Sequence, residues 1–360
     1  MTTDTHKQQK QPGWIRRMLP FLRAHRRNVA VAFGAALLGS AVAAATPAVE
    51  RQIVDNVILH HRSPLAPWLA FLIVAGAVRF GAAYVRRFIG GRVSLDVQYD
   101  IRNTIYDQLQ RLDFARHDEM QTGQLVSRAN SDVGLIQGLL AFLPIMSGNV
   151  LLLLASVVIM FILSPLLTVV SLIVVPLLGL VAMRMRGKVF PASWDSQQKA
   201  GEVAGVVDEA VTGVRVVKGF GQEDRELERL TDSAERLFAS RMRAVRLQAR
   251  YQPTLQALPV LGQVAILALG GWLALHHRIT IGTFLAFSTY LLQMVSPARM
   301  LAGLLTVGQQ ARAGAERILD LLDSNPIVTE RPDAEQLPTI RGDIELDGVT
   351  FGYLRSAPIL

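Results

Sequence analysis

The chain has 360 residues, of which 51% are hydrophobic, and its mean hydropathy is +0.31. This composition is too apolar for an ordinary soluble domain and is typical of a membrane protein. The formal net charge is +8, but the basic residues cluster beside apolar runs without interleaved aromatic residues, so nucleic-acid binding is not expected. The chain contains no cysteine, which excludes disulfides, thiolate metal sites and a cysteine nucleophile.

The N-terminal segment, residues 1–27, is polar and rich in Lys and Arg, and the positive-inside rule places it in the cytoplasm. The next residues, 28–49, form an apolar run without a charge that is long enough to cross a bilayer. Ala41, Val42 and Ala43 imitate a signal-peptidase site. However, the preceding polar segment is longer than that of a signal peptide, so we expect an uncleaved first span.

Five further apolar runs predict five more spans, at residues 66–89, 139–163, 166–183, 253–275 and 281–307. The links at 50–64, 164–165 and 276–280 are short and carry few Lys or Arg residues, whereas polar excursions at 92–137 and 184–251 are long and basic. The positive-inside rule therefore places the long excursions and both termini in the cytoplasm. The sequence predicts an all-α polytopic membrane protein with six transmembrane helices and long cytoplasmic extensions.

The two polar excursions are predicted to form helical stalks that project from the membrane. In the second, Gly213, Gly219 and Gly221 interrupt the helical pattern and supply the freedom that a tight reversal needs. The apolar stretch 214–220 is thereby presented at the tip, where it would suit docking against another protein. A helical hairpin whose valines pack within it is the alternative. In the first excursion, Gly123 predicts a break near the middle.

The C-terminal part changes character after residue 308. An amphipathic helix is expected to continue to about Leu322, and residues 323–340, with Pro326, Pro332 and Pro338, are predicted to be a linker. Residues 341–360 then suggest strands separated by a turn at Gly348, which is the start of an α/β domain. So short a segment cannot form a stable core, so we expect the chain to be part of a longer protein.

Four local patterns occur in a characteristic order along the chain. Pro47 precedes Ile53, Val54 and Asp55 at the end of the first span. The first stalk contains Thr122, Gly123, Ser127, Arg128, Asp132 and Val133, and the second contains Glu209, Gly213, Val217, Lys218, Phe220, Gly221 and Glu223. The fourth pattern is the run GDIELDGVTFGY at residues 342–353. Together they cover nearly the whole chain and resemble the membrane domain of an ABC exporter half-transporter of the type I fold, followed by the first strands of its nucleotide-binding domain.

This resemblance implies roles for individual residues. The stalk tips, residues 114–122 and 214–220, would dock into ATPase domains, and Tyr353 would stack on adenine. The implied coupling residues are Phe114, His117, Thr122, Gly123, Glu209, Gly213, Val217, Lys218, Gly219, Phe220 and Glu223. ATP and Mg²⁺ would be bound mainly outside this chain, which has no phosphate-binding loop of its own because Gly187 and Lys188 are followed by Val189.

Polar residues inside the spans are candidates for a substrate cavity. Arg79 lies near the middle of the second span, where a charge is costly unless it faces water, an anionic headgroup or a polar partner such as Glu50 or Asp55. Gln256 and Gln293, and also Gln263 and Asn149, would line the same cavity or else form hydrogen bonds between helices. His60, His61, His276 and His277 lie in external links without a carboxylate cluster, so no metal site is expected.

The predicted function is ATP-powered export of a hydrophobic or amphipathic molecule, such as a lipid or drug, by alternating access in the inner (plasma) membrane. The expected partners are membrane lipid, nucleotide-binding domains and a second half-transporter, identical or not. One alternative is a membrane scaffold or regulatory subunit that docks a separate ATPase. Another, a carrier driven by an ion gradient, is disfavoured because no span contains an Asp or Glu in its interior.

Overall fold

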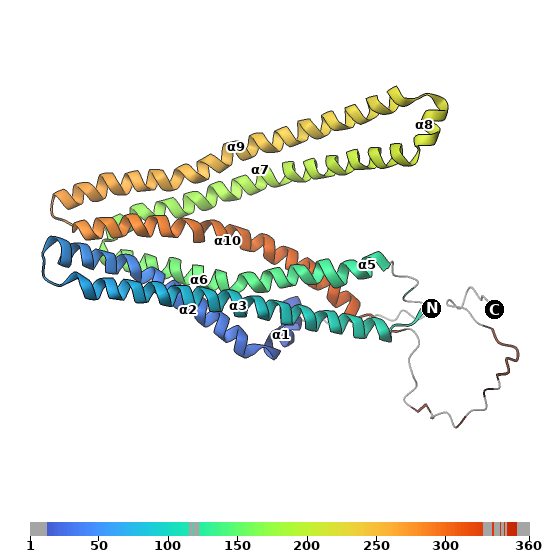
Figure 1. Cartoon of the computed structure of the whole chain (residues 1–360), viewed down its shortest axis with the longest axis horizontal. Helices are drawn as coiled ribbons and strands as arrows, with labels where there is room; N and C mark the ends of the chain where they lie inside the picture. The colour runs from blue at the N-terminus through green and yellow to red at the C-terminus, as the bar shows by residue number, and fades with distance from the viewer. Residues whose placement is uncertain are drawn as a thin grey trace, which may run out of the picture. The chain divides into compact units, whose positions relative to one another are not determined.

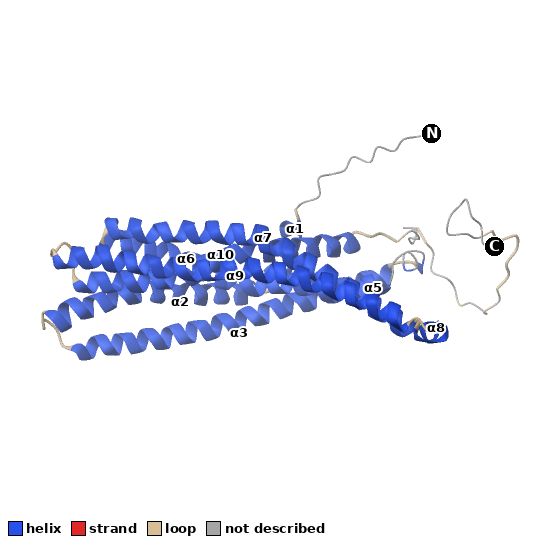
Figure 2. Ribbon diagram, turned by 90° about the horizontal axis from the view of Figure 1, so that it is seen from above, coloured by secondary structure: helices blue, strands red, loops and turns tan. Residues whose placement is uncertain are grey.

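The computed structural model describes residues 13–114, 117, 122–326, 333–334, 339, 342 and 344–350, which contain helices and no strand (Figures 1 and 2). Before the tip of the second stalk the helices are α1 (Trp14–Ala24), α2 (Arg26–Gln52), the π-helix η1 (Ile53–Leu59), α3 (Leu65–Arg111), α5 (Thr122–Ser127), the π-helix η2 (Arg128–Asp132), α6 (Val133–Leu163) and α7 (Pro165–Thr212). After it come α8 (Val214–Phe220), α9 (Glu223–Leu275) and α10 (Ile281–Leu322). The predicted all-α class is confirmed for these residues.

Five helices in the described part of the chain are long and apolar enough to cross a membrane. They cover Arg26–Leu59, Leu65–Arg111, Leu125–Leu163, Pro165–Thr212 and Glu223–Leu275. Each contains one of the first five predicted spans, which supports an integral membrane protein. The sixth predicted span, residues 281–307, lies within α10 and stays a prediction.

Two predicted interruptions differ from the structure. Residues 50–64 were expected to form a loop, but the helix continues through η1 to Leu59, because residues 48–59 contain neither proline nor glycine, and only residues 60–64 are not helical. The break predicted near the middle of the first stalk is present, since α3 ends at Arg111 and Leu112 and Asp113 are not helical, but Gly123 itself is the second residue of α5. A single glycine inside a helix costs only about 1 kcal/mol, which neighbouring turns can absorb.

Other predicted boundaries are confirmed. Ser164 adopts an extended backbone between α6 and α7, and Pro165 occupies the first turn of α7, where its missing N–H leaves no bond unmade. α9 ends at Leu275 and α10 begins at Ile281, as the predicted short link requires. α10 continues without interruption to Leu322, which confirms the helix expected after residue 308.

Helix α1 was not predicted, because the segment was judged only by its charge. Its apolar residues recur at helical spacing, from Trp14 through Met18 to Phe21 and Leu22, and Met18 is buried. This apolar stripe, on the side of the helix opposite its arginines, is the sequence signal that predicts α1.

The chain divides into two compact units, of which the first comprises Met1–Ala30, Phe88–Phe142 and Val307–Leu360. Its core follows from one stripe of α3, in which Val93, Val97, Ile101 and Ile105 repeat every four residues and are all buried. They pack with residues of α1, α6 and α10, among them Met18, Val133, Ile136, Ala315 and Ile318. This unit therefore contains the residues predicted to form the first stalk, 92–137.

The second unit comprises Val31–Arg87 and Leu143–Thr306 and includes the long hairpin of α7 and α9, which run side by side with α8 across their far end (Figure 1). Its core gathers large apolar side chains of α6, α7, α9 and α10, such as Met160, Leu167, Ile266, Phe287 and Tyr290. Glycines allow close packing: a Cβ on Gly148 would lie 2.7 Å from the Ser40 hydroxyl, and one on Gly262 would lie 2.6 Å from Val174. Such small residues let neighbouring membrane helices approach closely.

Side chains of α10 donate hydrogen bonds to backbone carbonyls of α2 in the turn before Pro47. Proline has no N–H, so the carbonyl of Ala43, four residues earlier, loses its helical partner. The Gln293 amide nitrogen donates to that oxygen at 3.0 Å, and the Tyr290 hydroxyl donates to the next carbonyl, Ala44, at 2.8 Å. In a membrane, where water is absent, such replacement of a lost backbone bond is what allows a proline inside a helix.

The predicted opening strands of a nucleotide-binding domain are not observed. Residues 344–350 lie in irregular backbone, with a bend at Gly348, whose φ of +56° agrees with the predicted turn. A strand requires a neighbour with which to pair, and this short stretch has none among the described residues. Tyr353 lies outside the described residues, so its adenine-stacking role stays a prediction.

Candidate functional site

The tip of the second stalk is built by two glycines and a short helix. α7 ends at Thr212, and Gly213 links it to α8. Gly221 ends α8 in the left-handed conformation, with φ of +60°, which glycine adopts without the steric cost of a Cβ. The Gln222 N–H donates to the Val217 carbonyl at 3.1 Å and closes the turn. Gly219, in contrast, is an ordinary helical residue of α8.

Two ion pairs hold this reversal in shape. Lys218 Nζ lies 2.8 Å from Glu223 Oε1 and joins α8 to the first residue of α9, while Arg229 lies 2.7 Å from Glu209 and joins α9 to α7. Hydrogen bonding from Lys218 lowers the pKa of Glu223, and hydrogen bonding to Glu209 raises the pKa of Arg229. All four groups are solvent-exposed, so these pairs orient the tip more than they stabilise it.

The side chains of α8 are accessible to solvent. No residue of α8 is buried, and the Phe220 side chain is 77% exposed. The alternative in which the valines of this segment pack within the hairpin is therefore not what the structure shows. An exposed apolar helix with Arg215 and Lys218 among its residues has the composition of a protein-docking surface.

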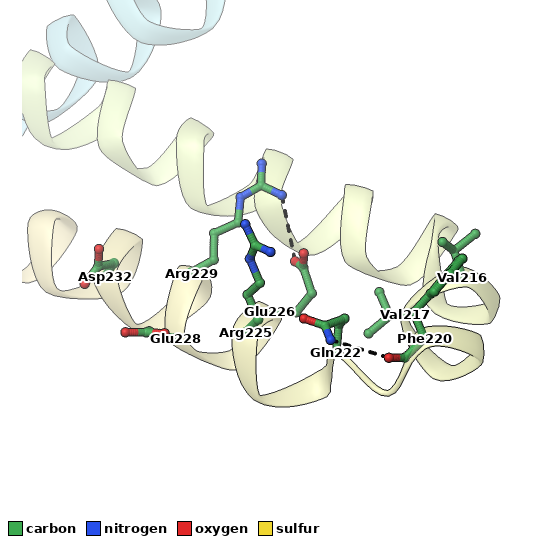
Figure 3. A pocket seen from close by; sticks show the side chains of 9 residues that line it. All are labelled: Val216, Val217, Phe220, Gln222, Arg225, Glu226, Glu228, Arg229 and Asp232. Atoms are coloured by element: carbon green, nitrogen blue, oxygen red, sulfur yellow. Dashed lines mark hydrogen bonds and ion pairs between the residues drawn. The ribbon is translucent and has the colours of Figure 1, made fainter.

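A groove of about 660 Å³ runs along the tip between α8 and the start of α9 (Figure 3). Its floor is apolar at Val216, Val217 and Phe220, and the Gln222 side chain donates to the Phe220 carbonyl at 3.4 Å. The α9 wall is charged. Its remaining lining residues are Gln222, Arg225, Glu226, Glu228, Arg229 and Asp232. An apolar floor beside a polar wall of both signs is the usual anatomy of a protein interface.

The tip of the first stalk is only partly described. Phe114 is 82% exposed, and the His117 ring nitrogen Nε2 lies 2.9 Å from the Leu109 carbonyl, near the end of α3. Thr122 and Gly123 begin α5. Of residues 115–121, only His117 is described, so the docking role of segment 114–122 stays a prediction.

The membrane-proximal part of the first stalk contains an ion pair, buried on its acidic side, that the sequence did not reveal. The Asp132 carboxylate, at the end of η2, accepts two hydrogen bonds from Arg317 of α10, the one from Nε being 2.9 Å long. These bonds raise the pKa of Arg317. Gly314 makes the approach possible, since a Cβ there would lie 2.9 Å from the Asp132 backbone oxygen. Arg102 of α3 donates to the carbonyl of Ala129, which lies near the start of η2, at 3.1 Å.

The structure brings together two of the candidate cavity residues, Arg79 and Asn149, but not Gln256 or Gln293. Arg79 lines a cavity of about 220 Å³ between α2, α3 and α6 that also includes Ser40, Arg86 and Asn149. Gln256 is exposed on α9 and does not line it, while Gln293 donates to Ala43. Gln293 thus has the interhelical role that was its alternative, although its Oε1 is buried without a partner among the described residues.

The proposed carboxylate partners of Arg79 are engaged elsewhere. Asp55 lies 3.5 Å from Arg51 and accepts from the Gly282 N–H at 2.8 Å and the Thr280 hydroxyl at 2.6 Å. Glu50 lies 3.5 Å from the Thr289 hydroxyl. Arg79 therefore has no ion-pair partner in the described part of the chain, and it lines the cavity.

Gly187 and Lys188 do not form a phosphate-binding loop. They lie within the continuous helix α7, whereas such a loop must turn its backbone N–H groups toward the phosphates.

The chain matches the family model of the ABC transporter transmembrane region over residues 29–298. Among curated proteins it is 41% identical over 344 residues to a multidrug efflux ATP-binding/permease protein of Mycobacterium tuberculosis, an alignment that covers 96% of this chain and 29% of the relative. It is 26% identical over 342 residues to an ATP-dependent lipid A-core flippase of Syntrophus aciditrophicus, with 94% of this chain and 57% of the relative covered.

A fatty acid ABC transporter ATP-binding/permease protein of Mycobacterium bovis is 31% identical over 264 residues, which are 72% of this chain and 41% of that protein. The chain thus spans between about a third and somewhat over half of the length of these relatives.

Proposed function

Because the chain belongs to the family of ABC transporter transmembrane regions, we propose that it is the membrane-spanning part of an ATP-driven exporter that works by alternating access. The structural observation that carries the proposal is α8, an exposed apolar helix across the end of two long antiparallel helices. A rigid helical hairpin that docks through its tip onto another domain can transmit a conformational change of that domain to the membrane spans.

The proposed cargo is a hydrophobic or amphipathic molecule of the lipid or drug class. The names of three relatives support it, since they specify multidrug efflux, a lipid A-core and a fatty acid. The spans argue only against a carrier driven by an ion gradient, because their interiors contain no carboxylate that would couple transport to such a gradient.

The proposed assembly has six spans, with α10 as the sixth, and cytoplasmic N- and C-termini. It is completed by a second half-transporter and by nucleotide-binding domains that hold ATP and Mg²⁺. From Arg184 to the end of α7, the stalk would extend roughly 40 Å at 1.5 Å per residue. The α8 docking surface would therefore stand well clear of the bilayer, where a cytoplasmic domain can reach it.

The test compares two substitutions of exposed phenylalanines on the same hairpin. Phe220→Asp places a charge on the docking surface, whereas Phe238→Asp makes the same change on α9, where Phe238 is also exposed. In the complete protein in proteoliposomes, Phe220→Asp is expected to abolish transport while ATP hydrolysis persists, and Phe238→Asp is expected to transport normally. Gly219→Pro, which breaks α8, should behave like Phe220→Asp. Normal transport by Phe220→Asp would refute the docking role.

A separate experiment addresses the cavity. If Arg79 meets the cargo, Arg79→Ala changes the relative transport rates of anionic and neutral amphipaths and leaves basal ATP hydrolysis intact. Loss of folded protein, measured by size-exclusion chromatography, would instead assign Arg79 a structural role.

A further inference from the structure

A second groove lies between α7 and α9, distant in sequence from the docking tip. Its volume is about 760 Å³, which is within the range of small-molecule sites. It is lined by Gly187, Lys188, Pro191, Ala192 and Asp195 of α7 and by Ala239, Arg243, Arg246 and Leu247 of α9. Three cationic side chains and one carboxylate thus face the same space.

The single carboxylate of this groove offsets only part of its positive charge. In the part of the chain that the structure describes, Lys188, Arg243 and Arg246 have neither an ion pair nor a hydrogen bond. Asp195 accepts a hydrogen bond from the Ser240 hydroxyl at 2.6 Å, which holds its carboxylate to α9. Three like charges around one opening repel one another, so an anion bound between them would be stabilised.

The groove opens where the apolar part of the hairpin ends. Lys188 lies roughly 8 Å along the helix beyond the apolar run 166–183, and Arg246 and Arg243 lie roughly 10 Å and 15 Å before Pro253, at the start of the next run. The polar headgroup layer of a bilayer extends roughly 5–8 Å beyond the hydrocarbon core, and the long Lys and Arg side chains bridge the remaining distance.

Two exposed aromatic residues of α7 lie beside the groove, roughly 10 Å and 16 Å along the helix beyond the apolar run. Phe190 and Trp194 of α7 stack with their ring centroids 6.5 Å apart, and both are well exposed. They immediately precede the lining residues Pro191 and Asp195 in sequence and therefore lie on the adjoining face of the helix. Phe190 therefore lies near the outer edge of the headgroup layer, whereas Trp194 lies beyond it.

We propose that this groove binds the phosphate of an anionic phospholipid headgroup from the cytoplasmic leaflet, with Lys188, Arg243 and Arg246 as its ligands. A free phosphate would supply the same chemistry. The lipid is favoured because a groove at this depth receives a headgroup while the acyl chains stay in the bilayer. The volume of the groove also exceeds what inorganic phosphate alone would fill.

The test measures binding of phosphatidylglycerol and of phosphatidylcholine to the complete purified protein in detergent, by native mass spectrometry. Arg243→Gln/Arg246→Gln removes two charges from the groove. Arg236→Gln/Arg241→Gln removes two charges from the same helix at positions that do not line it. The groove pair is expected to weaken phosphatidylglycerol binding roughly 25-fold, at about fivefold for each cation, and to leave phosphatidylcholine binding unchanged. The matched pair is expected to bind as the unaltered protein does.

Two further variants separate the site from general effects on folding. Asp195→Asn removes the one negative charge and is expected to strengthen phosphatidylglycerol binding, a gain that a misfolded protein would not show. Gly187→Leu fills the groove without a change of charge, since a Cβ there meets nothing within 4 Å, and is expected to weaken binding.

Two outcomes would overturn the proposal. Equal phosphatidylglycerol binding by the groove pair and the matched pair would show that the groove is not the site. Competition by inorganic phosphate at concentrations comparable to those of the lipid would assign the site to a soluble anion. Because the test involves no transport, its result is independent of the proposed export function.

Discussion

The ion pair between Asp132 and Arg317 is expected to contribute far more to the stability of the folded protein than the exposed pair between Arg312 and Glu316. The Asp132 side chain is 5% exposed and that of Arg317 is 48% exposed. Breaking a fully buried pair costs about 3–5 kcal/mol, and an exposed pair contributes about 0.2–1 kcal/mol. Since one partner is buried and the other half-exposed, Arg317→Met is expected to cost about 2 kcal/mol, mostly from leaving the carboxylate unpaired.

The chain offers a matched control one and a half turns away. Arg312 pairs with Glu316 on the same helix at 2.8 Å, and both side chains are exposed, so Arg312→Met is expected to cost only about 0.3–0.5 kcal/mol. Both variants and the unaltered protein would be unfolded thermally and in denaturant in the same mild detergent. Equal losses of stability for the two methionine variants would refute the reasoning.

A double-mutant cycle isolates the pair itself. Asp132→Asn removes the buried charge, so the double variant Asp132→Asn/Arg317→Met no longer contains an unpaired carboxylate. Its loss of stability is expected to fall short of the sum of the two single losses by about 1–2 kcal/mol. Strict additivity would mean that the two side chains do not interact energetically.

Three smaller predictions concern single positions. Gly282→Ala is expected to cost about 1–3 kcal/mol, because its Cβ would lie 2.6 Å from a backbone oxygen of α2, whereas Gly271→Ala, with open space around its Cβ, should be neutral in the same unfolding assay. Gly221→Ala should cost about 1 kcal/mol, because φ is +60° there, and the melting temperature should fall accordingly. Lys218→Met should raise the pKa of Glu223 toward its ordinary value of 4.5 in an NMR titration. In the unaltered protein, the lowered pKa of Glu223 stabilises the tip at pH values above 4.5. This stabilisation is lost as the pH falls through the pKa of Glu223 in the folded state.

The features that the sequence predicted are those that arise locally. The apolar runs predicted the first five spans, and the dipeptide Ser164–Pro165 predicted the tight turn between α6 and α7. Gly213 and Gly221 predicted the reversal at the tip of the second stalk. Each depends on periodicity or on backbone freedom within about ten residues. Gly123 shows the limit of that logic, because a glycine permits a break but does not require one.

The pairings that hold polar side chains in the interior were not predicted. Asp55 meets Gly282 across 227 residues, Asp132 meets Arg317 across 185, and Gln293 meets Ala43 across 250. Which carboxylate accepts from which helix depends on how the helices pack, and no local pattern encodes that. The same reason explains why Gln256 and Gln293 looked equivalent in sequence but have different surroundings, one exposed and the other bonded to α2.

The two buried acids of the described residues share one feature of local structure, since Asp55 lies in η1 and Asp132 ends η2. A π-turn inserts one residue into a helix and so rotates the side chains beyond it by about 100°, which redirects a polar group from the regular helical stripe. Both carboxylates thereby meet α10, Asp55 at its first residues and Asp132 near its last turns. A buried carboxylate cannot lose its donors without a cost of several kcal/mol. At either end, therefore, α10 cannot slide or rotate unless the π-turn that contacts it moves as well.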